Sequence, residues 1–159
     1  MGLLLRLDDT EDLVEFIVRS YGKARKIVEI GVGTYPWIAK GAKERLPETK
    51  VVVTDTNEET LATIKKACPE IEVVCDDILD PQMRVYEKAD LIYSLRPPPE
   101  IVREIMKLAA KVGCDVLIRP YPDEEGGYSY PISEGWRLIT HGRAVFYWLG
   151  KLDSHVRQT

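Results

Sequence analysis

Short runs of hydrophobic residues alternate along the chain with segments whose hydrophobic positions recur at helical spacing. The continuous runs predict buried strands at 26–31, 50–55, 71–77, 89–95 and 114–120. The amphipathic segments predict helices at 11–22, about 36–46, 57–68 and 99–113. Strands that are apolar on both faces and alternate with helices favour a parallel sheet covered on both sides. With right-handed crossovers, this order predicts a three-layer, doubly wound α/β fold.

The C-terminal part of the chain has a different pattern. Residues 120–135 are rich in glycine, proline and tyrosine, which is typical of a loop. Residues 136–140 and 144–149 are short strand-like runs joined by the turn "HGR", and they predict an antiparallel hairpin at the end of the mostly parallel sheet. An edge position for the apolar run 145–149 would favour a homodimer. No repeat or linker interrupts the chain, so residues 1–159 are expected to form a single domain.

Composition narrows the class of function. The formal net charge of -4 argues against a broadly basic nucleic-acid surface, but a local basic pocket for RNA is not excluded. No apolar run approaches the roughly 20 residues of a membrane helix, and the N-terminal segment turns acidic at once, so we expect a cytoplasmic protein. The cysteines and histidines lack metal-ligand spacing, so no metal site is expected. The scarcity of amide side chains resembles thermophile composition.

Residues 28–37, "VEIGVGTYPW", place two glycines at the end of the first strand of the doubly wound unit. In such sheets, ligands bind beyond the C-terminal strand ends where the strand order reverses. A dinucleotide needs a third glycine where this chain has Pro36, and Glu29 would add negative charge beside its pyrophosphate. S-adenosylmethionine has no phosphate and presents an ammonium and a sulfonium, which an acidic residue favours.

The segment "VEIGVGT" resembles the first motif of class I S-adenosylmethionine-dependent methyltransferases. The resemblance implies that Glu29 lies near the amino end of the methionine moiety and that Gly31 and Gly33 line it. Tyr35 stands where that family usually has its third glycine, and it could narrow the pocket or cover the ligand. The implied cofactor is S-adenosylmethionine.

Acidic residues follow the next two strands. Asp55 closes the second strand at the spacing expected of the carboxylate that binds the ribose hydroxyls, and both ligand classes predict it. The run "VVCDDI" resembles the methyltransferase position whose carboxylate accepts from the adenine amine. We assign that role to Asp77, with Asp76 as the alternative. A structural alternative stays open for the whole set, because glycines also permit tight turns and carboxylates also cap helices.

The segment "ADLIYSLRPPPE" resembles a small uncharacterised archaeal protein family with a trimmed methyltransferase-like fold. Amino-methylating enzymes carry an Asn or Asp, two prolines and an aromatic residue at this position. The run from Ser94 to Pro99 has the prolines but neither the polar residue immediately before them nor the aromatic residue after them. Amine methylation is therefore not inferred, and no catalytic base is assigned, although Ser94 is a candidate substrate contact.

Two strands run into an Arg-Pro pair, at Arg96 and at Arg119. If the strands are neighbours, the two guanidiniums lie at the same end of the sheet and could bind an anionic substrate facing the methyl donor. The alternative is that they pair with acidic neighbours, for which Glu100, Asp123 and Glu124 are the candidates. Tyr121, together with other tyrosines, could add a platform or lid over the substrate, or simply pack the loop.

Three functions remain open from the sequence. The first is a methyltransferase acting on an anionic small molecule or on RNA. The second is a methyltransferase-like module that binds a nucleoside or a protein partner without catalysis. The third, an NAD-binding protein, is disfavoured by Pro36 and Glu29.

Overall fold

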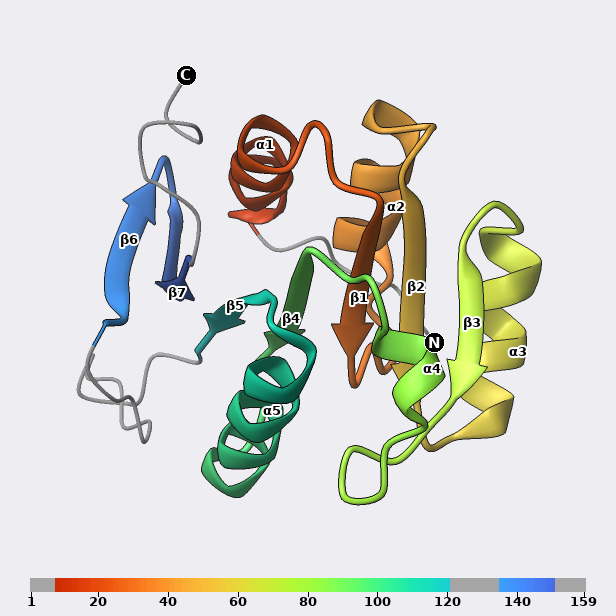
Figure 1. The fold of residues 1–159 in the computed structure, drawn as a ribbon. Helices are drawn as coiled ribbons and strands as arrows, with labels where there is room; N and C mark the ends of the chain where they lie inside the picture. The colour runs from red at the N-terminus through yellow and green to blue at the C-terminus, as the bar shows by residue number, and fades with distance from the viewer. Residues whose placement is uncertain (1–7, 121–134, 151–159) are drawn as a thin grey trace.

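The structure is a computed structural model of the 159-residue chain, and it describes residues 8–120 and 135–150. Seven strands form one sheet, and helices lie on both of its faces (Figure 1). The strands are β1 (Lys26–Ile30), β2 (Lys50–Asp55), β3 (Glu72–Cys75), β4 (Leu91–Leu95), β5 (Asp115–Arg119), β6 (Arg137–His141) and β7 (Ala144–Leu149). The helices are α1 (Thr10–Ser20), α2 (Trp37–Arg45), α3 (Glu58–Ala67), α4 (Met83–Tyr86) and α5 (Pro99–Val112).

The strand order is β3-β2-β1-β4-β5-β7-β6. The pairs among β1 to β5 are parallel, whereas β7 runs antiparallel to both β5 and β6. This confirms the predicted α/β fold, a mostly parallel sheet with a C-terminal antiparallel hairpin. The chain builds outward from β1 to β3 and then returns to place β4 on the other side of β1. The order therefore reverses between β1 and β4, which is the position where open α/β sheets bind ligands.

The hairpin takes a position that the sequence left open. Its second strand, β7, pairs with β5 from Val116↔Leu149 to Ile118↔Tyr147, so β7 lies between β5 and β6. The expectation that residues 145–149 could form a sheet edge is therefore wrong. That edge is formed by β6, which exposes Leu138. The apolar strand β7 pairs with β5 on one side and with β6 on the other, so it gives no support to a homodimer.

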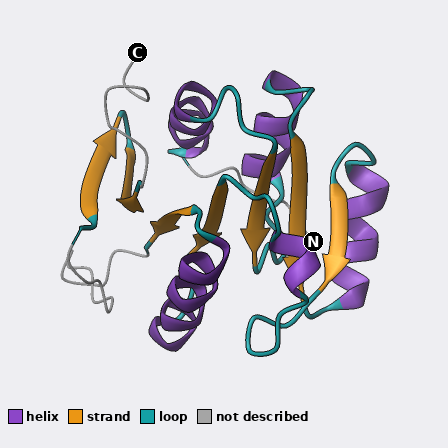
Figure 2. Cartoon of the chain, viewed as in Figure 1, coloured by secondary structure: helices purple, strands orange, loops and turns teal. Residues whose placement is uncertain are grey.

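Figure 2 shows helices on both faces of the sheet, and three apolar clusters hold them there. One cluster joins α1 and α2 to the residues of β1, β4, β5 and β7 that face them. A second joins α2 and α3 to β2, and the third packs α4 and α5 against the opposite face. Adjacent residues of β2 illustrate the division, since Val51 and Val53 belong to the α3 side and Val52 to the α5 side. The alternation explains why these strands are hydrophobic on both faces.

A buried polar network ties the hairpin to α1. The hydroxyl of Tyr21, which ends α1, donates to Asp115 Oδ2 at 2.7 Å and accepts from Trp148 Nε1 at 2.9 Å. These three side chains come from α1, β5 and β7 and are each less than 10% exposed. Because buried polar groups are costly without partners, the network favours one placement of the hairpin against β5 and α1.

Two local features bear on the site. The third strand ends at Cys75, so Asp76 and Asp77 both lie in the connection that follows it. The short helix α4 then brings Tyr86 back beneath Asp76, an element that the sequence pattern did not predict.

Within residues 8–120 and 135–150, no helix has the length and apolar character needed to cross a membrane.

Candidate functional site

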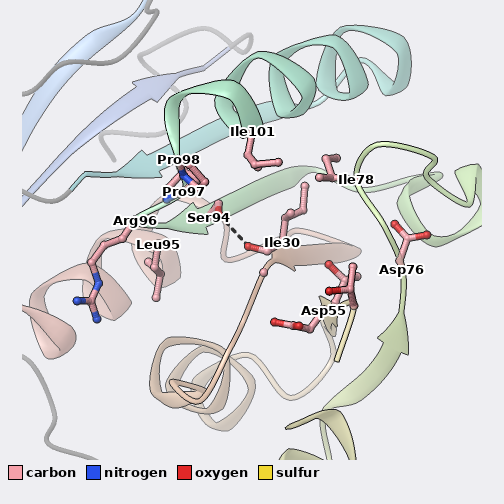
Figure 3. A pocket seen from close by; sticks show the side chains of 13 residues that line it. Ile30, Asp55, Asp76, Ile78, Ser94, Leu95, Arg96, Pro97, Pro98 and Ile101 are labelled. Carbon is pink, nitrogen blue, oxygen red and sulfur yellow. Dashed lines mark hydrogen bonds between the residues drawn. The ribbon is translucent and has the colours of Figure 1, made fainter. Parts of the chain in front are cut away.

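A cavity of about 250 Å³ opens at the C-terminal ends of the central strands, where the strand order reverses (Figure 3). The residues around it come from the ends of β1, β2 and β4, from the connection after β3 and from the start of α5. They are Ile30, Gly31, Thr54, Asp55, Thr56, Asp76, Ile78, Ser94, Leu95, Arg96, Pro97, Pro98 and Ile101. The cavity thus brings together predicted residues from four separate segments of the sequence.

The loop after β1 depends on its glycines. Gly31 and Gly33 have φ angles of +70° and +56°, which disfavour residues with a side chain, and a Cβ at either position would have no atom within 4 Å. The amides of Gly31 and Val32 both donate to the carbonyl of Thr54 at 3.0 Å. The amide of Gly33 donates to Asp55 Oδ2 at 2.8 Å. These three N–H groups therefore point at β2 and not outward, where a pyrophosphate would need them.

Asp55 sits between this loop and the start of α3. Its Oδ2 accepts from Gly33, and its Oδ1 accepts from the amide of Asn57 at 2.9 Å. Each carboxylate oxygen can accept two hydrogen bonds, so a lone pair on each oxygen remains for a ligand. The side chain is half-buried and lines the cavity. Asp55 can therefore position the glycine loop and still accept from a diol.

Glu29 lies beneath the loop and does not line the cavity. Its side chain is fully buried, Oε1 accepts from the hydroxyl of Tyr93 at 2.7 Å, and Oε2 has no hydrogen-bond partner among the described residues. Burial raises the pKa of Glu29 from its ordinary value of 4.5 to about 8, while the Tyr93 hydrogen bond opposes the rise and the charge of Asp55 adds to it. The carboxyl is therefore mostly protonated at neutral pH.

The two acidic residues after β3 differ in position. Asp76 is buried and lines the cavity, whereas Asp77 is exposed, does not line the cavity and accepts from the amide of Leu79 at 2.9 Å. Asp76 Oδ1 accepts from the backbone and side-chain amides of Gln82, and Oδ2 accepts from the hydroxyl of Tyr86. Oδ2 therefore keeps one lone pair for a ligand. Of the two candidates, the geometry of the cavity favours Asp76.

Tyr35, at the third-glycine position, turns away from the cavity. Its hydroxyl shares a short hydrogen bond with Thr10 Oγ1 at the start of α1, and its ring packs against the cluster between α1 and the sheet. The side chain is absent from the cavity wall, as is Gly33. Tyr35 therefore fixes the loop to α1 rather than narrowing this cavity.

The segment after β4 closes another side of the cavity. Ser94 is buried and donates from Oγ to the carbonyl of Ile30 at 2.8 Å, which locks the ends of β4 and β1 together. Arg96 has a φ of +58°, rare for a residue with a side chain, and its amide donates to the carbonyl of Arg119 at 2.7 Å. Its side chain extends away from Asp55 and Asp76 (Figure 3).

Arg119 has a different acidic partner from those the sequence suggested. Its Nε and Nη2 donate to the two oxygens of Asp9 at 2.6 and 2.8 Å, a bidentate pair across 110 sequence positions. Glu100, one of the candidate partners for the two arginines, is exposed at the start of α5, and the acidic partner of Arg119 is Asp9 instead. Asp123, Glu124 and Tyr121 lie outside the described residues. Arg119 does not line the cavity, while Arg96 does.

A second cavity, of about 480 Å³, lies between α2 and α3. Its lining residues are Thr34, Pro36, Trp37, Lys40, Asn57, Glu59, Thr60, Thr63, Ile64, Ala67 and Cys68. None of the predicted site residues that the structure describes lines it. No group of three or more potential metal-ligating side chains occurs in residues 8–120 and 135–150.

Comparison with known proteins places the chain in a family. A family model described as an uncharacterised protein family, UPF0146, matches residues 10–151. The chain belongs to the UPF0146 family. A UPF0146 protein of Pyrococcus furiosus is 40% identical over 139 residues, which cover 87% of this chain and 98% of that protein. A UPF0146 protein of Archaeoglobus fulgidus is 36% identical over 136 residues, covering 85% and 90% respectively. The predicted archaeal relationship is confirmed.

Solved structures with a similar fold are class I methyltransferases. Human N-acetylserotonin methyltransferase in complex with SAM matches with a TM-score of 0.66 at 13% identity, covering 92% of this chain and 52% of that chain. A human methyltransferase 10 domain containing protein matches with a TM-score of 0.63 at 13% identity, covering 92% and 83%. Streptomyces venezuelae DesVI matches with a TM-score of 0.57 at 13% identity, and the chain spans 58% of its length. These likenesses show a methyltransferase Rossmann-like fold.

The buried Glu29 predicts a pH-dependent difference in stability. Between pH 4.5 and about 8, the unfolded chain releases the Glu29 proton while the folded chain keeps it, so the stability present below pH 4.5 is lost as the pH rises towards 8. Glu29→Gln does not titrate. Its free energy of unfolding relative to wild type should therefore increase on the order of a few kcal/mol between pH 5 and pH 8.

Guanidinium-induced unfolding at several pH values measures this difference. Glu48→Gln, a change at an exposed glutamate, is the matched control and should keep a constant difference from wild type. A Glu29→Gln difference that does not vary with pH would show that Glu29 is ionised in the folded protein.

Proposed function

We propose that the chain binds S-adenosylmethionine in the cavity at the switch between β1 and β4. The observation that carries the proposal is that two carboxylates, those of Asp55 and Asp76, line the same cavity. The cavity lies beside a glycine loop whose amides already donate hydrogen bonds to β2. That combination suits a ligand with a diol, an amine and no phosphate. Support comes from solved structures of similar fold that are complexes with SAM or SAH, including N-acetylserotonin methyltransferase with SAM and the plantazolicin methyltransferase BpumL with SAH.

The adenosine half of the ligand uses the acidic side of the cavity. Asp55 accepts from the ribose hydroxyls through the lone pairs that Gly33 and Asn57 leave free. Asp76 accepts from the adenine amine through the remaining lone pair of Oδ2, and Asp77 is the alternative. Ile78 and Ile101 supply apolar surface for the purine ring.

The methionine half lies over the glycine loop. Gly31 and Gly33 leave open space above the backbone, and Glu29 lies below it. A ligand ammonium or sulfonium near Glu29 favours its ionised form, because an opposite charge stabilises the carboxylate. Binding would then release a proton from Glu29 to the solvent, and affinity would increase as the pH rises towards its raised pKa.

The activity that follows from this ligand is methyl transfer to a small molecule or to RNA. Bound S-adenosylmethionine supplies an electrophilic methyl group, and the protein contributes mainly by orienting the acceptor in line with the sulfonium. A second function, nucleoside binding without catalysis, is favoured by the sequence after β4, where Arg96 replaces the amide or acidic residue that amino-methylating enzymes place before the prolines.

Calorimetric titration with S-adenosylhomocysteine, S-adenosylmethionine and NAD tests the proposed ligand. Both S-adenosyl compounds should bind with similar affinity, and NAD should bind at least about tenfold more weakly, because the loop amides cannot turn to its pyrophosphate without breaking their bonds to β2. Tighter binding of NAD would contradict the proposal. Absence of binding by all three would leave the glycines as turn residues only.

The neighbouring pair Asp76 and Asp77 gives a matched test of the adenine contact. Asp76→Asn should weaken S-adenosylhomocysteine binding about tenfold or more, because a charge-assisted hydrogen bond contributes about 1.5–3 kcal/mol. Asp77→Asn removes the same charge one residue away and should leave the affinity unchanged. The reverse pattern, measured by the same titration, would move the adenine contact to Asp77.

A further inference from the structure

A space remains between α2 and α3, although both helices cover the same face of β2. The helix α2 packs closely against α1 but makes little contact with α3. Ala39 of α2 and Leu61 of α3 nevertheless belong to the one apolar cluster that covers β2 on this face. The cavity of about 480 Å³ occupies the interval between the two helices. Its volume lies within the range of roughly 300–1,000 Å³ that is typical of small-molecule sites.

Side chains of α3 form one wall of this cavity. They recur at the i, i+3, i+4 and i+7 positions of a helix, so they lie in a single stripe. The stripe consists of Thr60, Thr63, Ile64 and Ala67. Ile64 and Cys68 are 3% and 1% exposed and pack into the cluster over β2, so they close the floor of the cavity. The threonines and the alanine are short, and they leave the space above this floor open.

Trp37 of α2 forms the opposite wall. It is the first residue of the helix, it follows the buried Pro36, and its side chain is half-buried. The ammonium of Lys40, one turn further along α2, lies 5.7 Å from the centre of the indole ring. An indole ring presents a large, flat apolar surface. Because this surface faces a stripe of short side chains, the cavity suits a planar molecule that stacks on Trp37.

The polar groups of the cavity favour an uncharged ligand. Lys40 and Glu59 are the charged residues that line it, one of each sign, and Lys40 Nζ also lies 4.0 Å from Glu44. An ion entering the cavity would therefore lose hydration without meeting an excess of the opposite charge. Asn57 Oδ1 accepts from the amide of Thr60 and caps α3, which leaves the side-chain NH₂ group to donate. This group and the threonine hydroxyls suit heteroatoms at the edge of a ring.

We propose that the cavity between α2 and α3 binds an uncharged, planar aromatic heterocycle stacked on Trp37. The volume, the indole wall and the balanced charge of the lining carry the proposal. No residue lines both cavities, so this site is separate from the one proposed for S-adenosylmethionine. S-adenosylmethionine carries a sulfonium, an ammonium and a carboxylate, which place it outside the ligand class of this cavity. Binding here therefore goes beyond the proposed function and does not depend on it.

Titration of the ¹⁵N-labelled protein with quinoxaline, an uncharged heterocycle of two fused rings, tests the site. The chain has three tryptophans, and Trp37→Phe identifies the indole N–H signal of Trp37 in the ¹H–¹⁵N spectrum. Quinoxaline should shift this signal saturably, because its rings stack on that indole. Trp136 and Trp148 do not line the cavity, and their signals should stay unchanged. N-methylquinolinium and quinoxaline-2-carboxylate, a cation and an anion with two fused rings, should bind at least about tenfold more weakly.

Two exposed alanines of α3 give a matched pair of variants. Ala67 lines the cavity, and Ala62 does not. Ala67→Phe should fill the space and reduce the affinity for quinoxaline about tenfold or more, because the ligand loses its place on the indole. Ala62→Phe makes the same change elsewhere on the helix and should leave the affinity unchanged. The dispersion of the same spectra shows that both variants are folded.

An absence of a saturable shift at Trp37 would overturn the proposal, as would equal losses of affinity in Ala67→Phe and Ala62→Phe. Tighter binding of either ion would contradict the assigned ligand class. Displacement of quinoxaline by S-adenosylhomocysteine would show that this cavity takes the adenosyl ligand instead. Quinoxaline binding by a protein that does not bind S-adenosylhomocysteine would retain this site and remove the proposed function.

Discussion

The anchoring of the glycine loop to β2 is the constraint on which the site depends. The amides of Gly31 and Val32 donate to Thr54, and the amide of Gly33 donates to Asp55. These bonds draw the loop over the end of β2 and turn its N–H groups away from the cavity. They also fix Asp55 at the cavity wall, where each of its oxygens keeps a lone pair that could accept from a ligand. The same contacts that make the loop compact therefore disfavour a phosphate ligand, because the loop amides are already occupied. Polar contacts to a ligand in the cavity would then come from the carboxylates of Asp55 and Asp76.

Acidic side chains lie on one side of the cavity, and Arg96 lies on the other. Asp76 is held by Gln82 and Tyr86 from the α4 segment, and Glu29 is sealed beneath the loop with Tyr93. On the other side, Asp9 holds Arg119 beside Arg96.

The apolar runs and the two glycines were enough to predict the parallel sheet, its reversal and the residues at its strand ends. The sequence pattern was not enough to choose between Asp76 and Asp77, because β3 ends at Cys75 and both residues lie beyond the strand. The packing of Val74 toward the α5 side indicates which of the two carboxylates faces the cavity. The position of β7 depends on tertiary contacts such as Tyr21 with Asp115 and Trp148, which no local pattern encodes. The same is true of Asp9, whose partner Arg119 lies 110 positions away.

A crystal structure of the protein grown with S-adenosylhomocysteine tests the central claim most directly, because two cavities compete for the ligand. The account predicts the ribose hydroxyls on Asp55 and the adenine amine beside Asp76, in the cavity at the switch between β1 and β4. Because Asp55 and Asp76 do not line the second cavity, that space between α2 and α3 should remain free of the ligand. An S-adenosylhomocysteine molecule bound between α2 and α3, or one whose ribose makes no contact with Asp55, would contradict the account.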